Sequence, residues 1–227
     1  MGISLCRTKL NRASPFGFSC RRCIGCCRFK RIQLNPYEIA RMARELGLST
    51  TGFISEYTGN GGTVLQTRED GTCVFLHSAG CQIHPARPLV CRLYPLGRYV
   101  DYLGVETFAQ AELEEGCRGD LHESGTIDRY LEEQGAFPFM HAADLYLNLL
   151  WHLLDILKDQ GTESSESEKI LKKVRAVANG CDEGNELFWV DMDQAVAEYC
   201  RQTGITVPDD IEKRMAMHIE AVRKWVR

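Results

Sequence analysis

The residues best suited to do chemistry are four cysteines within eight positions: Cys20, Cys23, Cys26 and Cys27. A Cys-x-x-Cys turn can direct two sulfurs at one centre while backbone N–H groups face them, as in zinc ribbons and iron–sulfur sites. Gly25 lets such a turn bend tightly. The first three cysteines have the pitch of a ferredoxin-like run that lacks its fourth ligand. Because neighbouring side chains diverge, we expect Cys27 to face a second site or another edge of the same site.

Further cysteines follow downstream: Cys73, Cys81, Cys91 and Cys117. Eight thiolates divide naturally into two four-ligand sites, of either zinc or iron–sulfur type. The spacing settles neither the pairing of the cysteines nor the existence of a second site. We expect the other three cysteines to be unliganded, with Cys200 in the core of a helix: Cys6, Cys181 and Cys200.

The eleven cysteines also indicate a cellular compartment. Their number is odd, and the first ten residues are too broken by charge for the apolar run of a secretory signal. Both features favour the cytoplasm, where patterned cysteines are more often metal ligands than disulfides. The chain carries a formal net charge of −4, which argues against a globally basic nucleic-acid binder. We therefore expect neither nucleic acid nor a membrane as a partner.

Basic residues gather around the cysteines even though the chain is acidic overall. A buried four-thiolate site carries negative charge that something must offset, and guanidinium groups also favour the thiolate form. Five basic residues flank the first cluster: Arg21, Arg22, Arg28, Lys30 and Arg31. Four arginines flank the later cysteines: Arg87, Arg92, Arg98 and Arg118.

These motifs together resemble the YkgJ-type cysteine-cluster family, described as a zinc- or iron-chelating CxxCxxCC domain. That family includes flagellin lysine-N-methylase. The run from Cys20 to Cys27 is similar to its defining motif, and Gly71–Leu76 looks like a second block. A third block runs from Gly80 to Pro95 and contains Arg-Pro-x-x-Cys-Arg-x-Tyr-Pro, and Cys117-Arg-Gly resembles a closing block. The resemblance covers roughly residues 20–120.

The resemblance implies metal chelation by the eight cysteines, with an iron–sulfur cluster or zinc as the bound group. The methylase members imply transfer of a methyl group from S-adenosylmethionine to protein lysine. The chain has no glycine-rich turn between a strand and a helix that would support binding of that cofactor. In the third block, His84 could replace a thiolate, but packing is the favoured role, and Tyr94 with Pro95 is expected to shape the loop around the metal.

The fold class expected from these patterns is α+β: a small, irregular, metal-stapled domain with short strands, followed by a helical C-terminal region. Residues 1–19 show no periodicity and are expected to be irregular. Asn35 and Pro36 predict the start of a helix that Gly47 ends. Residues 49–57 favour a second short helix, residues 63–76 a hairpin, and residues 98–108 extended chain. Further helices are expected at 126–134, 142–158, 170–178, 192–201 and 209–226.

Composition shifts divide the chain into four parts. Residues 1–125 form the cysteine-cluster domain, and residues 126–160 a helical extension packed on it. Residues 161–169 form a polar linker, and residues 170–227 the C-terminal helices. The apolar stretch from Phe137 to Leu157 is interrupted by charged residues and histidines, so it predicts a core helix and not a bilayer span. Asp191 and Asp193 could belong to an acidic metal site, although a run of surface carboxylates is the favoured interpretation.

Three functions remain open at this stage, and the sequence leaves open whether the chain is an enzyme. The first is an iron–sulfur protein, of four-iron, four-sulfur type, with one or two centres and a redox role. The second is a zinc-stabilised adaptor whose C-terminal helices bind a protein partner. The third is a protein-lysine methyltransferase that uses S-adenosylmethionine. We rank them in that order.

Overall fold

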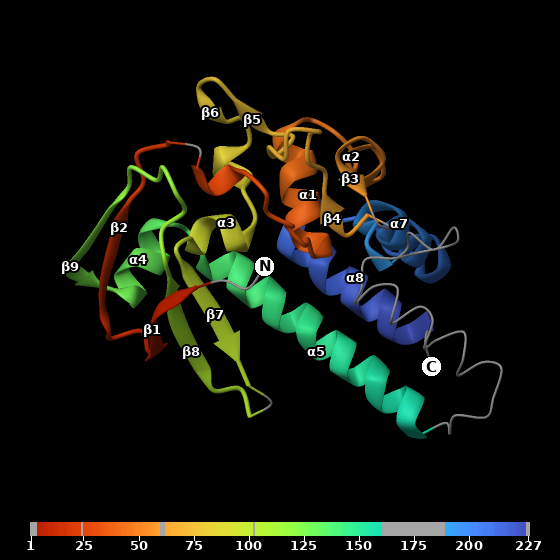
Figure 1. The fold of residues 1–227 in the computed structure, drawn as a ribbon. Helices are drawn as coiled ribbons and strands as arrows, with labels where there is room; N and C mark the ends of the chain where they lie inside the picture. Colours follow the sequence, from red (N-terminus) through yellow and green to blue (C-terminus); the bar gives the residue numbers. More distant parts are fainter. Residues whose placement is uncertain (1–3, 24, 60–61, 102, 160–188, 226–227) are drawn as a thin grey trace. The chain divides into compact units, whose positions relative to one another are not determined.

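The computed structural model describes residues 4–23, 25–59, 62–101, 103–159 and 189–225. Helices and short antiparallel strands combine in an α+β fold (Figure 1). The chain forms two compact units, and each is built from two separate segments. Unit 1 comprises Met1–Lys30 and Thr67–Met140, and unit 2 comprises Arg31–Gln66 and His141–Arg227. All cysteines of the predicted metal site belong to unit 1.

A three-stranded antiparallel sheet forms one part of unit 1, with the strand order β1-β8-β7. Its strands are β1 (Leu5–Leu10), β7 (Leu96–Val100) and β8 (Glu106–Ala111). Phe108 of β8 lies opposite both Arg98 and Leu10. The predicted extended segment at 98–108 is therefore two paired strands joined by a turn. Asp101 organises that turn, because its side chain accepts the backbone N–H groups of Leu103 and Val105.

A second pair of strands corrects the expectation that residues 1–19 are irregular. Strand β2 (Pro15–Ser19) pairs antiparallel with β9 (Asp120–Thr126). The His122 ring lies over Gly17, so a Cβ there would lie 2.0 Å from the ring and would displace this exposed side chain. The prediction failed because β1 and β9 are mostly exposed, which hides any apolar alternation, and because both pairings join residues about one hundred positions apart.

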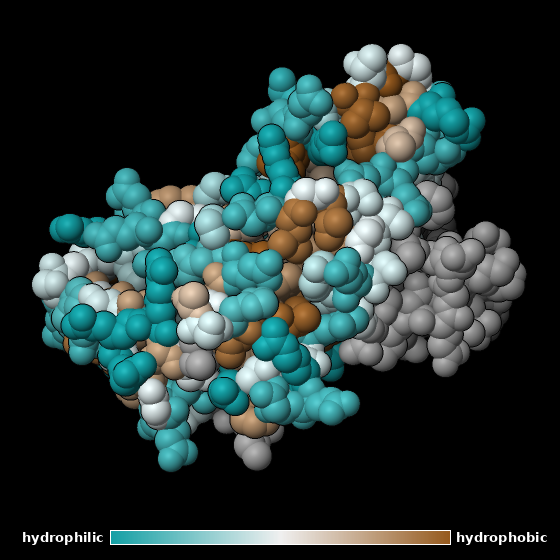
Figure 2. All heavy atoms as spheres, turned by 90° about the horizontal axis from the view of Figure 1, so that it is seen from above, coloured by the Kyte–Doolittle hydropathy of each residue, from teal (hydrophilic) through white to brown (hydrophobic). Residues whose placement is uncertain are grey.

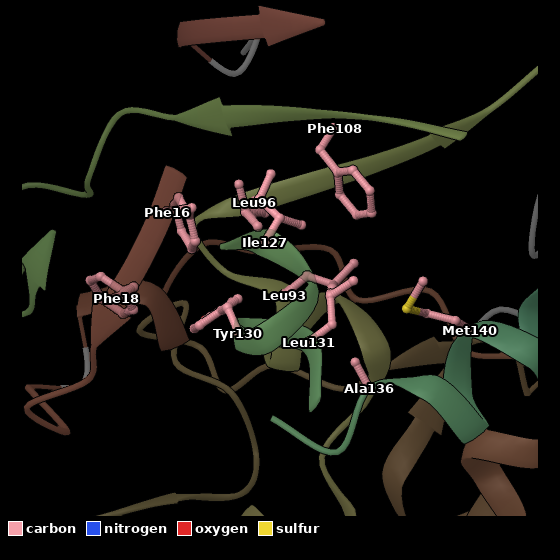
Figure 3. Close-up of a cluster of buried hydrophobic side chains, with 10 residues drawn as sticks. All are labelled: Phe16, Phe18, Leu93, Leu96, Phe108, Ile127, Tyr130, Leu131, Ala136 and Met140. Carbon is pink, nitrogen blue, oxygen red and sulfur yellow. The ribbon is translucent and has the colours of Figure 1, made fainter. Parts of the chain in front are cut away.

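The hydrophobic core of unit 1 lies between these strands and the helices that follow them (Figure 3). Helix α4 (Ile127–Glu133) begins at Thr126, whose hydroxyl accepts the Arg129 N–H, and it contacts β2 and β9. The buried side chains of this core come from strands, loops and helices: Phe16, Phe18, Leu93, Leu96, Phe108, Ile127, Tyr130, Leu131, Ala136 and Met140. The Phe16 and Tyr130 rings meet edge to face, with centroids 5.0 Å apart.

The cysteine-bearing part of unit 1 consists of very short elements. They are η1 (Gly25–Cys27), β5 (Leu76–His77), β6 (Gly80–Cys81), η2 (His84–Ala86) and α3 (Leu89–Leu93). The hairpin predicted at 63–76 is confirmed only next to its turn, where Thr67 forms an isolated antiparallel bridge with Cys73; the strands on either side pair elsewhere. Strand β4 (Val64–Leu65) pairs with β3 (Thr58–Gly59), and β5 pairs with β6. A tight turn at 68–72 separates the two halves, held by the Arg68 N–H to Thr72 carbonyl bond.

Unit 2 is mainly helical, and its first helix begins as predicted. Helix α1 (Pro36–Glu45) has a complete capping box: Asn35 accepts the Glu38 N–H, and the Glu38 carboxylate accepts the Asn35 N–H. The other helices of this unit also lie close to their predicted ranges. They are α2 (Thr50–Tyr57), most of α5 (Phe137–Asp159), α7 (Met192–Thr203) and α8 (Ile211–Trp225). The helix predicted at 170–178 and the linker at 161–169 lie outside the described residues.

Asp191 joins two segments of unit 2 and corrects its interpretation as a surface carboxylate. Its side chain is fully buried and caps α7 by accepting the Gln194 N–H. It also accepts the hydroxyls of Thr50 and Thr51, at 2.5 and 2.6 Å. Asp193 accepts the Thr50 N–H at 2.9 Å. These acidic side chains are occupied in tying the start of α2 to the start of α7.

Helix α5 has the character of a core helix, as its sequence predicts. It buries Phe139, Met140, Tyr146, Leu149 and Leu153. None of the helices in the described ranges has both the length and the apolar content needed to cross a bilayer. The face of the molecule drawn in Figure 2 is largely hydrophilic, with hydrophobic areas between the hydrophilic ones.

Candidate metal centre

Cys20 and Cys23 lie in irregular chain, and the next two cysteines lie in a single turn of 3-10 helix. The turn η1 contains Cys26 and Cys27, and Cys23 and Cys20 precede it. Gly25 packs against the backbone of the loop before Cys117, with an added Cβ 3.6 Å from the Glu115 carbonyl and the Cys117 nitrogen. The cysteine run and the loop at 115–117 are therefore neighbours.

This contact brings together Cys23 and Cys117, whose Sγ atoms lie 3.9 Å apart. Cys23 Sγ also accepts the backbone N–H of Arg118 at 3.2 Å. That hydrogen bond lowers the pKa of the Cys23 thiol, because it stabilises the thiolate. Burial raises the pKa of Cys117. The Tyr94 hydroxyl interacts with Cys117 and accepts the Glu114 N–H at 2.8 Å, so it holds this loop in place.

A second neighbourhood forms where residues 27–29 run antiparallel to residues 71–73. The Cys73 N–H donates to the Cys27 carbonyl at 2.9 Å, and the Phe29 N–H donates to the Gly71 carbonyl at 2.8 Å. Strands β5 and β6 then return the chain, and Cys81 lies near enough to Cys73 and Cys26 to interact electrostatically with both. Burial raises the pKa of both Cys73 and Cys81.

The Cys26 thiol lies between these two neighbourhoods. A hydrogen bond with Cys27 raises its pKa, and burial adds to that shift. Its charge also interacts with those of Cys23 and Cys81. The expectation that Cys27 faces a second site, or another edge of the same site, stays a prediction.

The remaining predicted ligands, Cys20 and Cys91, are exposed and lie near Arg87. Burial lowers the pKa of Arg87, whereas the charges of Cys91, Cys81 and Cys20 raise it. The guanidinium group is fixed by a 2.7 Å bond to the His84 carbonyl and a 2.7 Å bond to Gln134 Oε1. Arg87 thus places a positive charge among three of the expected thiolates.

Two other arginines expected to offset thiolate charge have structural roles instead. Arg92 is buried, and it donates to the carbonyls of Arg87 and Gln134 at 3.0 and 2.8 Å and to that of Pro85. Its guanidinium also stacks over the Phe139 ring, 3.9 Å from the centroid. Arg98 pairs with Glu106 at 2.5 Å. The Cys-Arg-x-Tyr-Pro run therefore contributes packing as well as a thiol.

Two other residues of the third block, His84 and Tyr94, were given roles in the sequence analysis. His84 is half-buried, and its Nδ1 lies 3.3 Å from the Arg87 guanidinium. Tyr94 packs edge to face on Phe18 and accepts the Tyr130 hydroxyl at its backbone carbonyl, so it shapes the loop as expected. Gln134 was not identified from the sequence, because nothing in the residues around it indicates that its side chain accepts a hydrogen bond from Arg87.

The donor set of unit 1 has the right chemistry for a thiolate metal site. All ten cysteines that the structure describes are free thiols, and eight of them are the predicted ligands. Thiolates are the preferred ligands of zinc and of iron–sulfur clusters. Within the described ranges, no group of three or more His, Cys, Asp or Glu side chains is placed to hold one metal ion. The cysteines lie instead in the pair and the neighbourhoods described above.

The cysteines outside the predicted ligand set lie elsewhere or are otherwise occupied. Cys6 is exposed on β1, with its Sγ 3.4 Å from the Gln110 carbonyl. Cys200 is buried in α7 and contacts Met217 Sδ at 3.3 Å, which confirms its predicted place in a helix core. Cys181 lies outside the described residues.

A comparison with protein families matches the segment that carries these thiols. Residues 19–118 match the family model CxxCxxCC, whose description reads "Putative zinc- or iron-chelating domain". The match covers 100 of the 227 residues of the chain. The match begins one residue before Cys20 and ends one residue after Cys117, so it encloses all eight predicted ligands. No curated protein and no solved structure matches the chain.

Proposed function

We propose that the CxxCxxCC domain of this protein chelates one or two metal centres through Cys20, Cys23, Cys26, Cys27, Cys73, Cys81, Cys91 and Cys117. The observation that carries the proposal is the 3.9 Å separation of the Cys23 and Cys117 sulfurs. These two residues come from opposite ends of the family segment. A metal ion bound by both thiolates would hold two such distant residues at this separation.

The same distance favours a single metal ion bound by both thiolates. Zn–S bonds of about 2.3 Å in a tetrahedron place two sulfurs about 3.8 Å apart. In a four-iron, four-sulfur cluster each cysteine binds a different iron at a cube corner, which holds the sulfurs farther apart. The geometry therefore supports a mononuclear thiolate site at Cys23 and Cys117, with zinc as its first candidate. This reverses the order in which the sequence alone ranked zinc and iron–sulfur.

When bound, such an ion supplies cross-linking of the loops that hold its ligands. The protein contributes the remaining features of the site. The Arg118 N–H favours the thiolate of Cys23, and the Arg87 guanidinium adds positive charge near Cys20, Cys81 and Cys91. Loops this short have little core of their own, so metal binding is coupled to their folding.

A redox role is the second candidate and follows only if the bound group is an iron–sulfur cluster. The positive charge of Arg87 beside three cysteines suits an anionic cluster as well as zinc. Methyl transfer from S-adenosylmethionine is not supported by any observation on the described residues. The protein partner expected at the C-terminal helices likewise stays a prediction, as does a cytoplasmic location.

The test is elemental analysis of protein purified without oxygen, with acid-labile sulfide and a visible spectrum measured on the same sample. We expect zinc, no sulfide and no visible absorbance. Iron and sulfide in equal amounts would establish the redox candidate and refute the mononuclear site. A protein that is folded yet contains no metal, and takes up none when zinc or ferrous iron is added, would refute chelation.

A further inference from the structure

Unit 2 contains a pocket of about 390 Å³, and none of the cysteines lines it. It is lined by the end of α1, the start of α2, and the starts of α7 and α8. A volume near the lower end of the range for ligand sites suits a small molecule. Every lining residue belongs to unit 2, so the pocket is complete within that unit.

The wall of the pocket is held in place by a network that needs no ligand. Asp193 accepts the Thr50 N–H at 2.9 Å and pairs with Arg214 at 3.0 Å. Arg214 Nε also donates to the Pro208 carbonyl at 2.7 Å. Behind them, the buried Asp191 binds the Thr50 hydroxyl. These bonds join the ends of three helices, and the pocket is therefore preformed.

Two further charges line the pocket and have no such partners. Arg44, in the last turn of α1, and Asp209, just before α8, are both exposed. Within the described part of the chain neither side chain forms a hydrogen bond or an ion pair, and they do not pair with each other. The lining of the pocket thus includes one guanidinium and one carboxylate that no other side chain of the described residues neutralises.

The remaining lining is apolar. Ala40, Ala43 and Ile211 are buried, and Leu48 is partly exposed. At Gly47 the pocket wall has no side chain, and a Cβ placed there would meet nothing within 4 Å. The surface therefore combines an apolar patch with a guanidinium and a carboxylate.

We propose that this pocket binds a free α-amino acid with an aliphatic side chain. Arg44 would take the carboxylate, because the guanidinium fork matches carboxylate geometry. Asp209 would take the ammonium group, and Ala40, Ala43 and Ile211 would contact the side chain. A zwitterion can pair with both side chains at once, whereas a singly charged ligand can pair with only one of them.

The proposal can be tested on the full-length, metal-loaded protein by isothermal titration with L-leucine and then with the other common amino acids. We expect saturable binding of at least one aliphatic amino acid. L-leucinamide lacks the carboxylate and 4-methylpentanoate lacks the ammonium group. Each should bind about tenfold more weakly than L-leucine, or more weakly still, because each loses a charged hydrogen-bonding partner.

Variants separate this site from nonspecific binding. Arg44→Gln and Asp209→Asn should each weaken binding about tenfold or more, without changing the metal content or the melting temperature. Arg223→Gln and Glu45→Gln remove exposed charges of the same signs outside the pocket and should bind as the natural chain does. The proposal is overturned if no amino acid titrates to saturation. It is equally overturned if both analogues bind like the amino acid, or if the pocket variants match their controls.

Discussion

The Sγ atoms of Cys23 and Cys117 lie 3.9 Å apart, although 94 positions separate these residues in the chain. Two thiolates on one tetrahedral ion have nearly this spacing. We predict that replacing the metal by cobalt(II) gives sulfur-to-cobalt charge-transfer absorbance. Cys23→Ser and Cys117→Ser should each reduce it by a similar amount, because each removes one thiolate from the same ion.

The matched controls for this experiment are Cys6→Ser and Cys200→Ser. Cys6 is an exposed thiol of the same unit, and Cys200 is buried in the helical unit. Both variants should retain the absorbance and the metal content of the natural chain. If Cys200→Ser lost metal while Cys117→Ser kept it, the ligand assignment would be wrong.

Arg92 should be among the residues on which the stability of the cysteine domain depends most. It is only 6% exposed, donates to three backbone carbonyls and stacks on Phe139. Arg92→Met keeps much of the volume but leaves those carbonyls without their donor. We expect the free energy of unfolding to fall by about 3 kcal/mol. Chemical denaturation of the metal-loaded protein measures this change.

Arg129→Gln serves as the comparison for Arg92, since its pair with Glu133 is exposed along one helix. Such pairs contribute about 0.5 kcal/mol or less. If Arg92→Met and Arg129→Gln lowered the free energy of unfolding equally, the hydrogen bonds of Arg92 would not be what stabilises the cysteine domain.

Glu106 should make stability depend on pH in the acidic range. Burial alone would raise its pKa, but hydrogen bonds from Arg12 and Arg98 outweigh burial, and the pKa is lowered overall. A carboxyl with a lowered folded pKa stabilises the protein above its unfolded pKa of about 4.3. That contribution is lost as the pH falls through the folded value. We expect Glu106→Gln to cost about 1–2 kcal/mol at pH 7 and progressively less below pH 4.

Thermal unfolding of the Glu106 variant between neutral pH and about pH 3 checks this sign. Glu123→Gln is the control, because Glu123 pairs with Arg7 while 70% of its side chain is exposed. The curve of the control should run parallel to that of the natural chain. A Glu106→Gln deficit that grew on acidification would contradict the argument.

Asp191 should matter for stability and not for metal binding. Removing its buried carboxylate leaves the buried Thr50 hydroxyl, the partly buried Thr51 hydroxyl and the Gln194 N–H without their acceptor. We expect Asp191→Ala to lower the unfolding free energy by about 3 kcal/mol. Metal content per folded protein should be unchanged. Loss of metal from a still-folded variant would instead support the acidic metal site that the sequence left open.

Local signals in the sequence predicted the helices well. Asn35 predicted the start of α1 because a cap acts within three residues. The cap at Asp191 is equally local, although Asp191 was interpreted from the sequence as a surface carboxylate. The strands could not be predicted in this way. Leu5 pairs with Ala111 and Gly17 with His122, and such pairings are decided by packing between distant segments.

The candidate site shows the same division. The types and spacing of the eight cysteines are local and identify the chemistry. The contact of Cys23 with Cys117, and the fixing of Arg87 by Gln134, depend on how separate loops pack. The proposed preference for zinc rests on the Cys23–Cys117 distance, which no local pattern in the sequence provides.

The division of each unit into two segments has a consequence for the growing polypeptide. Cys23 is synthesised 94 residues before Cys117, and helix α1 and strands β3 and β4, which belong to the other unit, are made in between. At about 5–20 residues per second, roughly 5–20 s pass before the two thiols can meet. The core of unit 1 must wait longer still, because it needs Tyr130 and Met140. Throughout that interval the thiols of the nascent chain have not met their partners from later in the sequence. They must stay reduced until then, so folding of unit 1 requires a supply of reductant during translation.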